Sequence, residues 1–200
     1  MRIPQFIIPI LSLLLAVGIT QLSAQSLEVD KNESRLWIEG HSNVNEFRCI
    51  ANQYETSVQQ NGKIEETNPS ELEVGVDIIV ESFDCGRSRM NRDLREALKA
   101  DRHRAIQFRY LNTQDIRYNE ESETYSLLVE GVLTVAGTEK NIVFEMTGEL
   151  INENKIKAYG QTKIDMSDFN IDPPVAMLGL IKVRDRLTVH FNLLANYRDI

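Results

Sequence analysis

Residues 125–146 read YSLLVEGVLTVAGTEKNIVFEM, and this stretch decides the fold class that the sequence predicts. Apolar residues alternate with polar or small ones on both sides of the segment AGTEK, which has the composition of a turn. Such alternation places one set of side chains on a single face of a β-strand. The alternating positions are Leu127, Val129, Gly131, Leu133 and Val135 before the turn and Ile142, Phe144 and Met146 after it. The stretch therefore predicts two half-buried strands joined by a turn.

The same alternation continues outward from this hairpin toward both ends of the chain. Strand-like runs occupy residues 35–40, 72–83, 106–110 and 187–193, and Asn61-Gly62 is the favoured central pair of a type I′ hairpin turn. Sequential antiparallel strands close readily into a barrel, because closure removes exposed sheet edges. We therefore predict an all-β fold, an eight-stranded antiparallel barrel. A β-sandwich would show the same periodicity and is the alternative.

Residues 87–104 differ from their surroundings because they read as one charged helix. Met90, Leu94, Ala97 and Leu98 follow the spacing of a narrow apolar stripe along such a helix. We expect this short helix to close one end of the barrel before the chain returns to the sheet.

The other face of the expected helix is basic. Seven basic residues could contact an anionic lipid head group or an anionic membrane surface: Arg87, Arg89, Arg92, Arg95, Lys99, Arg102 and Arg104. Of these, Arg92, Arg95 and Lys99 are singled out as the head-group candidates. The alternative is a solvated face with internal ion pairs, such as Arg92 with Glu96 one turn later. The sequence leaves both interpretations open.

Residues 1–24 have the pattern of a secretory signal. Arg2 precedes an apolar run from Phe6 to Ile19, and small and polar residues follow it as far as Ala24. The run is shorter than the roughly 20 apolar residues that a membrane span needs. We therefore expect cleavage near Ala24, a mature domain of residues 25–200 and a periplasmic or secreted protein. An uncleaved N-terminal anchor is the alternative.

Cys49 and Cys85 are the only two cysteines, so the chain allows one intramolecular disulfide. An exported chain meets an oxidising compartment, in which a disulfide persists. A bridge between them would stabilise the fold by about 3–4 kcal/mol in the chain-entropy model. We expect this disulfide, with two free, buried thiols as the alternative.

The composition narrows the classes of function. The formal net charge of -8 argues against general nucleic-acid binding, which needs a basic surface. His41, His103 and His190 are the only histidines, and none lies in a recognisable catalytic-triad, H-E-x-x-H or G-x-S-x-G motif. The cysteines do not show metal-ligand spacing. We therefore expect a non-catalytic protein without a metal or a resident cofactor.

Four segments occur in a characteristic order: LKADRHRAIQF, VEGVLTVAGTEKNIVF, TKIDMSDFNI and VRDRLTVHFNLLA. Over residues 27–195 the chain resembles the YceI-like family of exported, lipocalin-like polyisoprenoid-binding proteins. The second segment is similar to the family pattern V-x-G-x-L-T-x-x-G-x-T-K-x-V through Val129, Gly131, Leu133, Thr134, Gly137, Thr138, Lys140 and Ile142. The chain departs from the family at His103-Arg104, where an aromatic-Pro pair is usual, at Met166, where Arg is usual, and at Asn170, where Gly is usual.

The resemblance implies a barrel that holds an isoprenoid or another long apolar lipid. Large apolar residues on the inward faces are the candidates for lining it: Ile38, Phe47, Val76, Ile78, Phe108, Val129, Leu133, Phe144, Phe169, Met177, Leu178 and Phe191. The alternative is a core that these residues fill, in a structural module that binds a protein partner through its loops. The aperiodic segment PPVAMLGLI, residues 173–181, would either gate the barrel mouth or pack down on the core.

Overall fold

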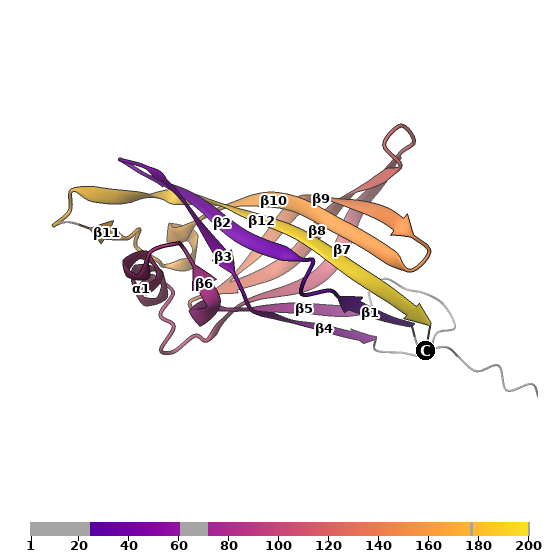
Figure 1. Ribbon diagram of the computed structural model, residues 1–200, viewed down its shortest axis with the longest axis horizontal. Helices are drawn as coiled ribbons and strands as arrows, with labels where there is room; N and C mark the ends of the chain where they lie inside the picture. The colour runs from indigo at the N-terminus through magenta and orange to yellow at the C-terminus, as the bar shows by residue number, and fades with distance from the viewer. Residues whose placement is uncertain (1–24, 61–71, 177, 200) are drawn as a thin grey trace, which may run out of the picture.

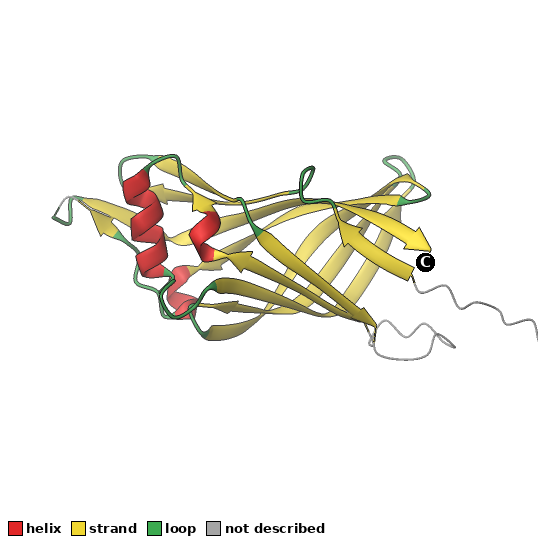
Figure 2. Cartoon of the chain, turned by 60° about the horizontal axis from the view of Figure 1, so that its bottom comes forward, coloured by secondary structure: helices red, strands yellow, loops and turns green. Residues whose placement is uncertain are grey.

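The computed structural model describes residues 25–60, 72–176 and 178–199 of the 200-residue chain. This part is a strongly curled antiparallel sheet with a short helix across one end (Figure 1, Figure 2). The prediction of an all-β, lipocalin-like barrel with one end covered by a helix is therefore confirmed. Residues 1–24, the Asn61-Gly62 turn and Met177 lie outside the described residues.

The described ranges contain twelve strand segments, so the expected count of eight was not exact. The strands are β1 (Gln25–Val29), β2 (Arg35–Ser42), β3 (Glu46–Ala51), β4 (Tyr54–Gln60), β5 (Leu72–Ile79), β6 (Phe83–Asp84), β7 (Ala105–Asn119), β8 (Thr124–Val135), β9 (Thr138–Asn152), β10 (Lys155–Asp165), β11 (Val175–Ala176) and β12 (Ile181–Asp199). The helical segments are η2 (Val80–Ser82), α1 (Ser88–Ala97) and η3 (Met166–Phe169). Short segments such as β6 and β11 account for part of the difference.

The hydrogen-bonded order of the sheet is β4-β5-β7-β8-β9-β10-β12-β2-β3-β6, with β1 and β11 also paired to β12. The order ends at β4 and β6 instead of returning to its start, so the described sheet is a barrel with an open seam. Strand β12 pairs with β10 on one side and with β2 on the other. This long strand therefore links β2 and β3, from the first part of the chain, to β8, β9 and β10 in one sheet.

The hairpin of β8 and β9 is the one that the alternating sequence predicts. Val129 pairs with Phe144, and the register runs without a shift to the last pair, Val135 and Thr138. The two residues between them, Ala136 and Gly137, both have positive φ, at 49° and 83°, which matches the twist that a two-residue hairpin turn needs.

Aromatic rings lie close to the backbone inside the barrel. A Cβ atom at Gly131 would overlap the ring of Phe108, and one at Gly160 would overlap the ring of Phe191. Phe144 joins the two rings, with ring centroids 5.7 Å from Phe108 and 5.6 Å from Phe191 and edge-to-face geometry. The two glycines thus make room for an aromatic cluster on the inner face of the sheet.

The disulfide and the apolar stripe of the helix agree with the sequence predictions, but α1 ends at Ala97, and residues 98–102 of the expected helix form turns instead. Leu94 and Ala97 of α1 pack against the buried core, and Leu98, just beyond its last turn, is buried. The Cys49–Cys85 disulfide joins β3 to the segment that leads into α1. No helix among the described residues is long and apolar enough to cross a membrane.

The outer wall carries a polar cluster where β2 meets β12. The ring of Trp37 stacks on His190 with centroids 4.9 Å apart, and the guanidinium of Arg48 lies over Trp37. The Glu39 carboxylate accepts hydrogen bonds from Arg48 Nε and Nη2 at 2.9 and 2.6 Å and from Trp37 Nε1 at 3.2 Å. The hydrogen bonds from Arg48 are the main reason that the pKa of Glu39 lies below its usual value.

Candidate functional site

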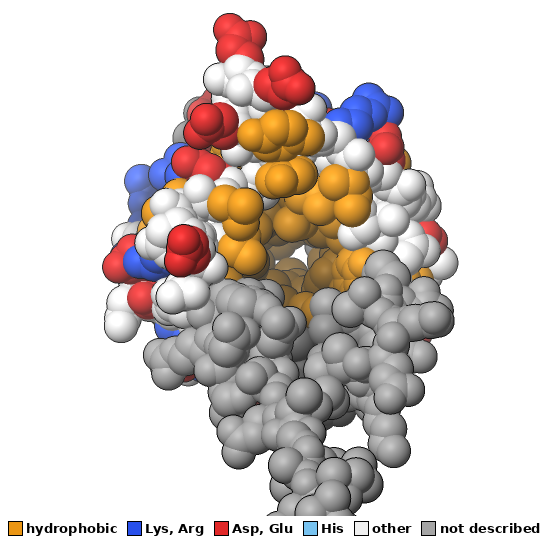
Figure 3. Space-filling view, turned by 90° about the vertical axis from the view of Figure 1, so that its right-hand side faces the viewer, with side chains coloured by type: hydrophobic (Ala, Val, Ile, Leu, Met, Phe, Trp, Pro, Cys, Tyr) orange, Lys and Arg blue, Asp and Glu red, His pale blue; other side chains and the backbone are white. Residues whose placement is uncertain are grey.

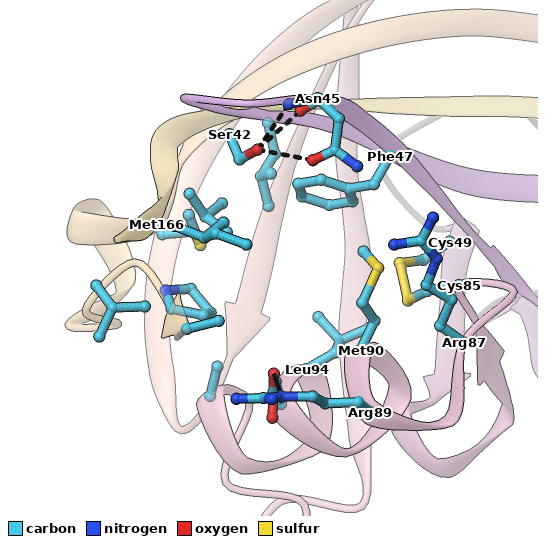
Figure 4. A pocket seen from close by; sticks show the side chains of 18 of the residues that line it. Ser42, Asn45, Phe47, Cys49, Cys85, Arg87, Arg89, Met90, Leu94 and Met166 are labelled. Carbon is cyan, nitrogen blue, oxygen red and sulfur yellow. Dashed lines mark hydrogen bonds and ion pairs between the residues drawn. A yellow bond between two sulfur atoms is a disulfide. The ribbon is translucent and has the colours of Figure 1, made fainter. Parts of the chain in front are cut away.

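A cavity of about 380 Å³ lies between α1, the β2–β3 hairpin and the segment from η3 to β12 (Figure 4). Most of the side chains that line it are apolar. They are Val44, Phe47, Met90, Leu94, Ala97, Leu98, Met166, Ile171, Pro174, Val175, Ala176, Ile181, Val183 and Leu187, together with the Cys49–Cys85 bridge and the polar residues Ser42, Asn45, Arg87, Arg89 and Asp93.

The helix supplies one wall of this cavity. All four members of its apolar stripe, Met90, Leu94, Ala97 and Leu98, line the space, and Met90 and Leu94 point into it (Figure 4). Helical spacing of three and four residues brings such side chains onto one face. The stripe therefore covers the end of the barrel without filling the space beneath it.

The opposite wall comes from η3 and the residues that follow it. Met166 and Ile171 are buried and line the cavity. The backbone between them reverses at Asn170, whose φ of 55° lies in the left-handed region that asparagine tolerates better than most residues. This conformation explains how an asparagine can stand where the family pattern has glycine.

Two polar residues in the wall, Ser42 and Asn45, are paired with each other. The hydroxyl of Ser42 lies 2.8 Å from Asn45 Oδ1 and accepts the backbone N–H of Asn45 at 3.0 Å. The start of α1 is held by Asn91, which accepts the backbone N–H of Cys85 at 2.7 Å and donates to Asp84 at 3.2 Å. Because these groups are satisfied, the cavity presents a mainly apolar surface.

Charged groups gather where α1 begins. Arg87 and Arg89 line the cavity and are exposed, and Arg89 Nε lies 3.8 Å from Asp93 Oδ2. The three residues predicted to meet a head group do not line this cavity. Arg92 lies 3.7 Å from Glu96, and Arg95 lies 3.3 Å from Glu81 of η2. Arg92 and Arg95 thus form internal pairs, while Arg87 and Arg89 occupy the rim.

A second apolar space opens at the end of the barrel opposite α1. Figure 3 looks into this end and shows hydrophobic side chains around a hollow. Leu127 of β8 and Met146 of β9 pair on the inward face, two residues beyond the buried Val129, and both are only half-buried. Ile116 and Tyr118 of β7 continue this face and are exposed. The described side chains therefore leave apolar surface uncovered inside the barrel.

The family model for the YceI-like domain matches residues 27–195, most of the chain. The protein is a member of the YceI-like family. The chain matches none of the curated proteins with which it was compared.

Solved structures show the fold of this YceI-like chain in other proteins. A polyisoprenoid binding domain from Saccharophagus degradans, described as implicated in plant cell wall breakdown, superposes with a TM-score of 0.68 at 12% identity, covering 88% of this chain and 100% of that one. BcnA from Burkholderia cenocepacia gives a TM-score of 0.64 at 19% identity, with 84% and 99% covered. A Campylobacter jejuni YceI protein gives 0.54 at 18% identity, with 74% and 83% covered.

The structure gives five outcomes for the lining residues predicted for the YceI-like barrel. Phe47 lines the cavity under α1. Ile38, Ile78, Val129, Leu133 and Phe169 are buried in the core, and Val76, Phe108, Phe144 and Phe191 are half-buried in the interior. Leu178 projects fully into solvent, and Met177 is not described. For Phe47, Met177 and the buried and half-buried residues, contact with a ligand remains a prediction, and Leu178 does not line the cavity under α1.

Several cavity residues were not among the predicted lining set. Met90 and Leu94 were visible as an apolar stripe, but helical spacing alone predicts packing as readily as a cavity wall. Met166 and Ile171 belong to a segment without regular alternation, so the sequence carried no signal for their direction. The described residues hold no cluster of three or more His, Cys, Asp or Glu side chains placed to bind a metal ion.

Proposed function

We propose that this YceI-like protein binds and carries a long apolar lipid, an isoprenoid or an acyl chain, in the barrel interior without catalysing a reaction. The observation that carries the proposal is the cavity of about 380 Å³ under α1, which is lined mainly by apolar side chains. Its volume falls in the range of about 300–1,000 Å³ that small-molecule sites occupy.

The energetics favour an apolar occupant. Each methylene group that moves from water into such a space contributes about 0.8 kcal/mol. The cavity under α1 and the hollow at the opposite end both present apolar surface that the described protein side chains leave uncovered. A long chain with few polar groups would cover this surface without leaving a polar atom unpaired.

The comparisons support the class of ligand in general terms. The Saccharophagus degradans domain is described as polyisoprenoid binding, and its fold is similar to that of this chain. The signal pattern of residues 1–24 and the disulfide support an exported protein, periplasmic or secreted, because disulfides persist in oxidising compartments.

Organic extraction of the purified protein, followed by mass spectrometry, tests the proposal. We expect an isoprenoid or acyl lipid to co-purify in a fixed ratio to protein. A protein that yields no such lipid, and takes up none from detergent-free solution, would contradict lipid carriage. That result would favour the alternative, a module with a filled core that binds a protein partner through its loops.

Two blocking variants locate the ligand. Ala97→Trp places a large ring in the cavity under α1, and Ala158→Trp places one on the inward face of β10 near the opposite hollow. Glu96→Trp is the control for the first, because the Glu96 side chain is 71% exposed on the same helix. We expect at least one blocking variant to lose bound lipid while the control retains it. Wild-type lipid content in both folded blocking variants would refute binding in the interior.

A further inference from the structure

Two hairpin tips meet at the end of the barrel that α1 covers, and each carries exposed aliphatic side chains. The tip between β11 and β12 extends past the helix (Figure 1). The tip between β2 and β3 is hydrogen-bonded to the start of β12. Val44 of the β2–β3 hairpin is 63% exposed, and Val175, Leu178 and Leu180 of the β11–β12 hairpin are 62%, 107% and 72% exposed. Scattered single apolar residues are ordinary on a surface, but four at one end form a feature that needs an explanation.

The two tips are tied together. The backbone N–H of Asn43 donates to the carbonyl of Lys182 at 3.0 Å, and its side-chain amide donates to the carbonyl of Leu180 at 2.9 Å. The backbone N–H of Lys182 donates in return to Asn43 Oδ1 at 2.9 Å. Three hydrogen bonds between one asparagine and the opposite tip hold both hairpins in place.

The backbone of the second tip holds Leu178 outward at a cost. Leu178 has a φ of 57°, a left-handed conformation that leucine rarely adopts, and it precedes Gly179 with a φ of 89°. A leucine that is strained and fully exposed contributes nothing to the core. Backbone strain of this kind is a reason to look for a function at the position.

Basic groups accompany the aliphatic tips. Arg87 and Arg89 stand at the rim of the cavity under α1, which Val44 and Val175 also line. Lys182 and Arg184 are exposed on the first residues of β12. Aliphatic side chains flanked by basic ones match the interface of a membrane, where the apolar groups enter the acyl boundary and the cations meet lipid phosphates.

We propose that the tip residues Val44, Val175, Leu178 and Leu180 dock the protein on a bilayer with anionic head groups, with Arg87 and Arg89 against the phosphates. Docking in this orientation turns the cavity mouth toward the bilayer. The role of this docking in lipid carriage rests on the proposed function. A stable protein interface covers about 800 Å² on each partner and has aromatic or arginine anchors at its centre. The tips offer four aliphatic side chains at two loop ends, which suits a bilayer better.

Co-sedimentation with vesicles tests the docking. One set of vesicles contains phosphatidylcholine alone and the other contains equal parts of phosphatidylcholine and phosphatidylglycerol. We expect the wild-type protein to bind the anionic set more tightly and Leu178→Asp/Leu180→Asp to lose binding by at least about tenfold, since each leucine loses its burial in the interface. The matched control is Ile151→Asp at the opposite end of the barrel, where Ile151 is 45% exposed, and it should bind as wild type does.

A second variant separates the contribution of the arginines to vesicle binding from that of the leucines. Arg87→Gln/Arg89→Gln should remove much of the preference for anionic vesicles and reduce the loss of binding on adding salt. Wild-type protein that sediments with neither set, or a Leu178→Asp/Leu180→Asp variant that sediments like wild type, would overturn the docking proposal.

The lipid content of the same variants distinguishes this proposal from lipid carriage. Leu178→Asp/Leu180→Asp should take up lipid from detergent-free solution to the wild-type ratio, because neither leucine lines the cavity. Docking without any bound lipid would refute carriage and leave the docking surface in place. Bound lipid without docking would refute the docking surface alone.

Discussion

Removing the Cys49–Cys85 disulfide should destabilise the fold by an amount that follows from the length of the loop that it closes. The bridge closes a loop of 36 residues that contains β4, β5 and β6. The chain-entropy relation gives about 3.8 kcal/mol for a loop of this length at room temperature. The change to make is Cys49→Ala/Cys85→Ala, because Cys49 is buried and a serine hydroxyl there would need a new partner.

Urea unfolding followed by far-ultraviolet circular dichroism measures the effect. With a slope of about 2 kcal/mol per molar urea, the midpoint should fall by about 2 M. Wild-type protein treated with a phosphine reductant is the control, because it loses the bond and keeps both sulfur atoms in the cavity wall. A reduced wild-type protein whose midpoint stays within about 0.5 M of the oxidised one would refute the entropic account, since that shift is only about 1 kcal/mol.

Two further predictions concern single side chains. Tyr54 is buried and its hydroxyl has no hydrogen-bond partner among the described residues, so Tyr54→Phe should leave the free energy of unfolding unchanged or raise it by up to about 1 kcal/mol. A loss of stability in a urea titration would instead mean that the hydroxyl has a partner. The pKa of Glu39 is lowered chiefly by its hydrogen bonds from Arg48, so this carboxylate stabilises the fold above its unfolded pKa, and that contribution is lost as the pH falls through the lower, folded pKa. Arg48→Ala should raise the pKa of Glu39 in a carboxyl NMR titration, and an unchanged value would contradict the assignment.

Most of the fold could be predicted from the sequence because the long strands are half-buried. In β8, Val129 and Val135 are more buried than the residues on either side of them, and a period of two is legible over such lengths. The disulfide was predictable because only one pairing of cysteines exists. The strand count was not, since β6 and β11 contain two residues each and are too short to show a period.

The candidate site was less accessible to sequence reasoning. Alternation shows that Val129 and Leu127 share a face, but one is buried and the other half-buried, and that difference depends on neighbouring strands. The helix presents a similar limit. Its pattern shows two faces, but which arginines reach the cavity rim depends on how α1 lies across the barrel, so Arg87 and Arg89 were not singled out.

Trp37 is the only tryptophan of the chain, and it stacks on His190 where β2 meets β12. Its neighbour Glu39 hydrogen-bonds to the same histidine across 151 residues of sequence. Contacts between segments so far apart in the sequence require a large loss of chain entropy when they form, and they slow folding. The indole is therefore a built-in optical reporter for the joining of the first strands to the last, because the stacking on His190 forms only when β2 pairs with β12.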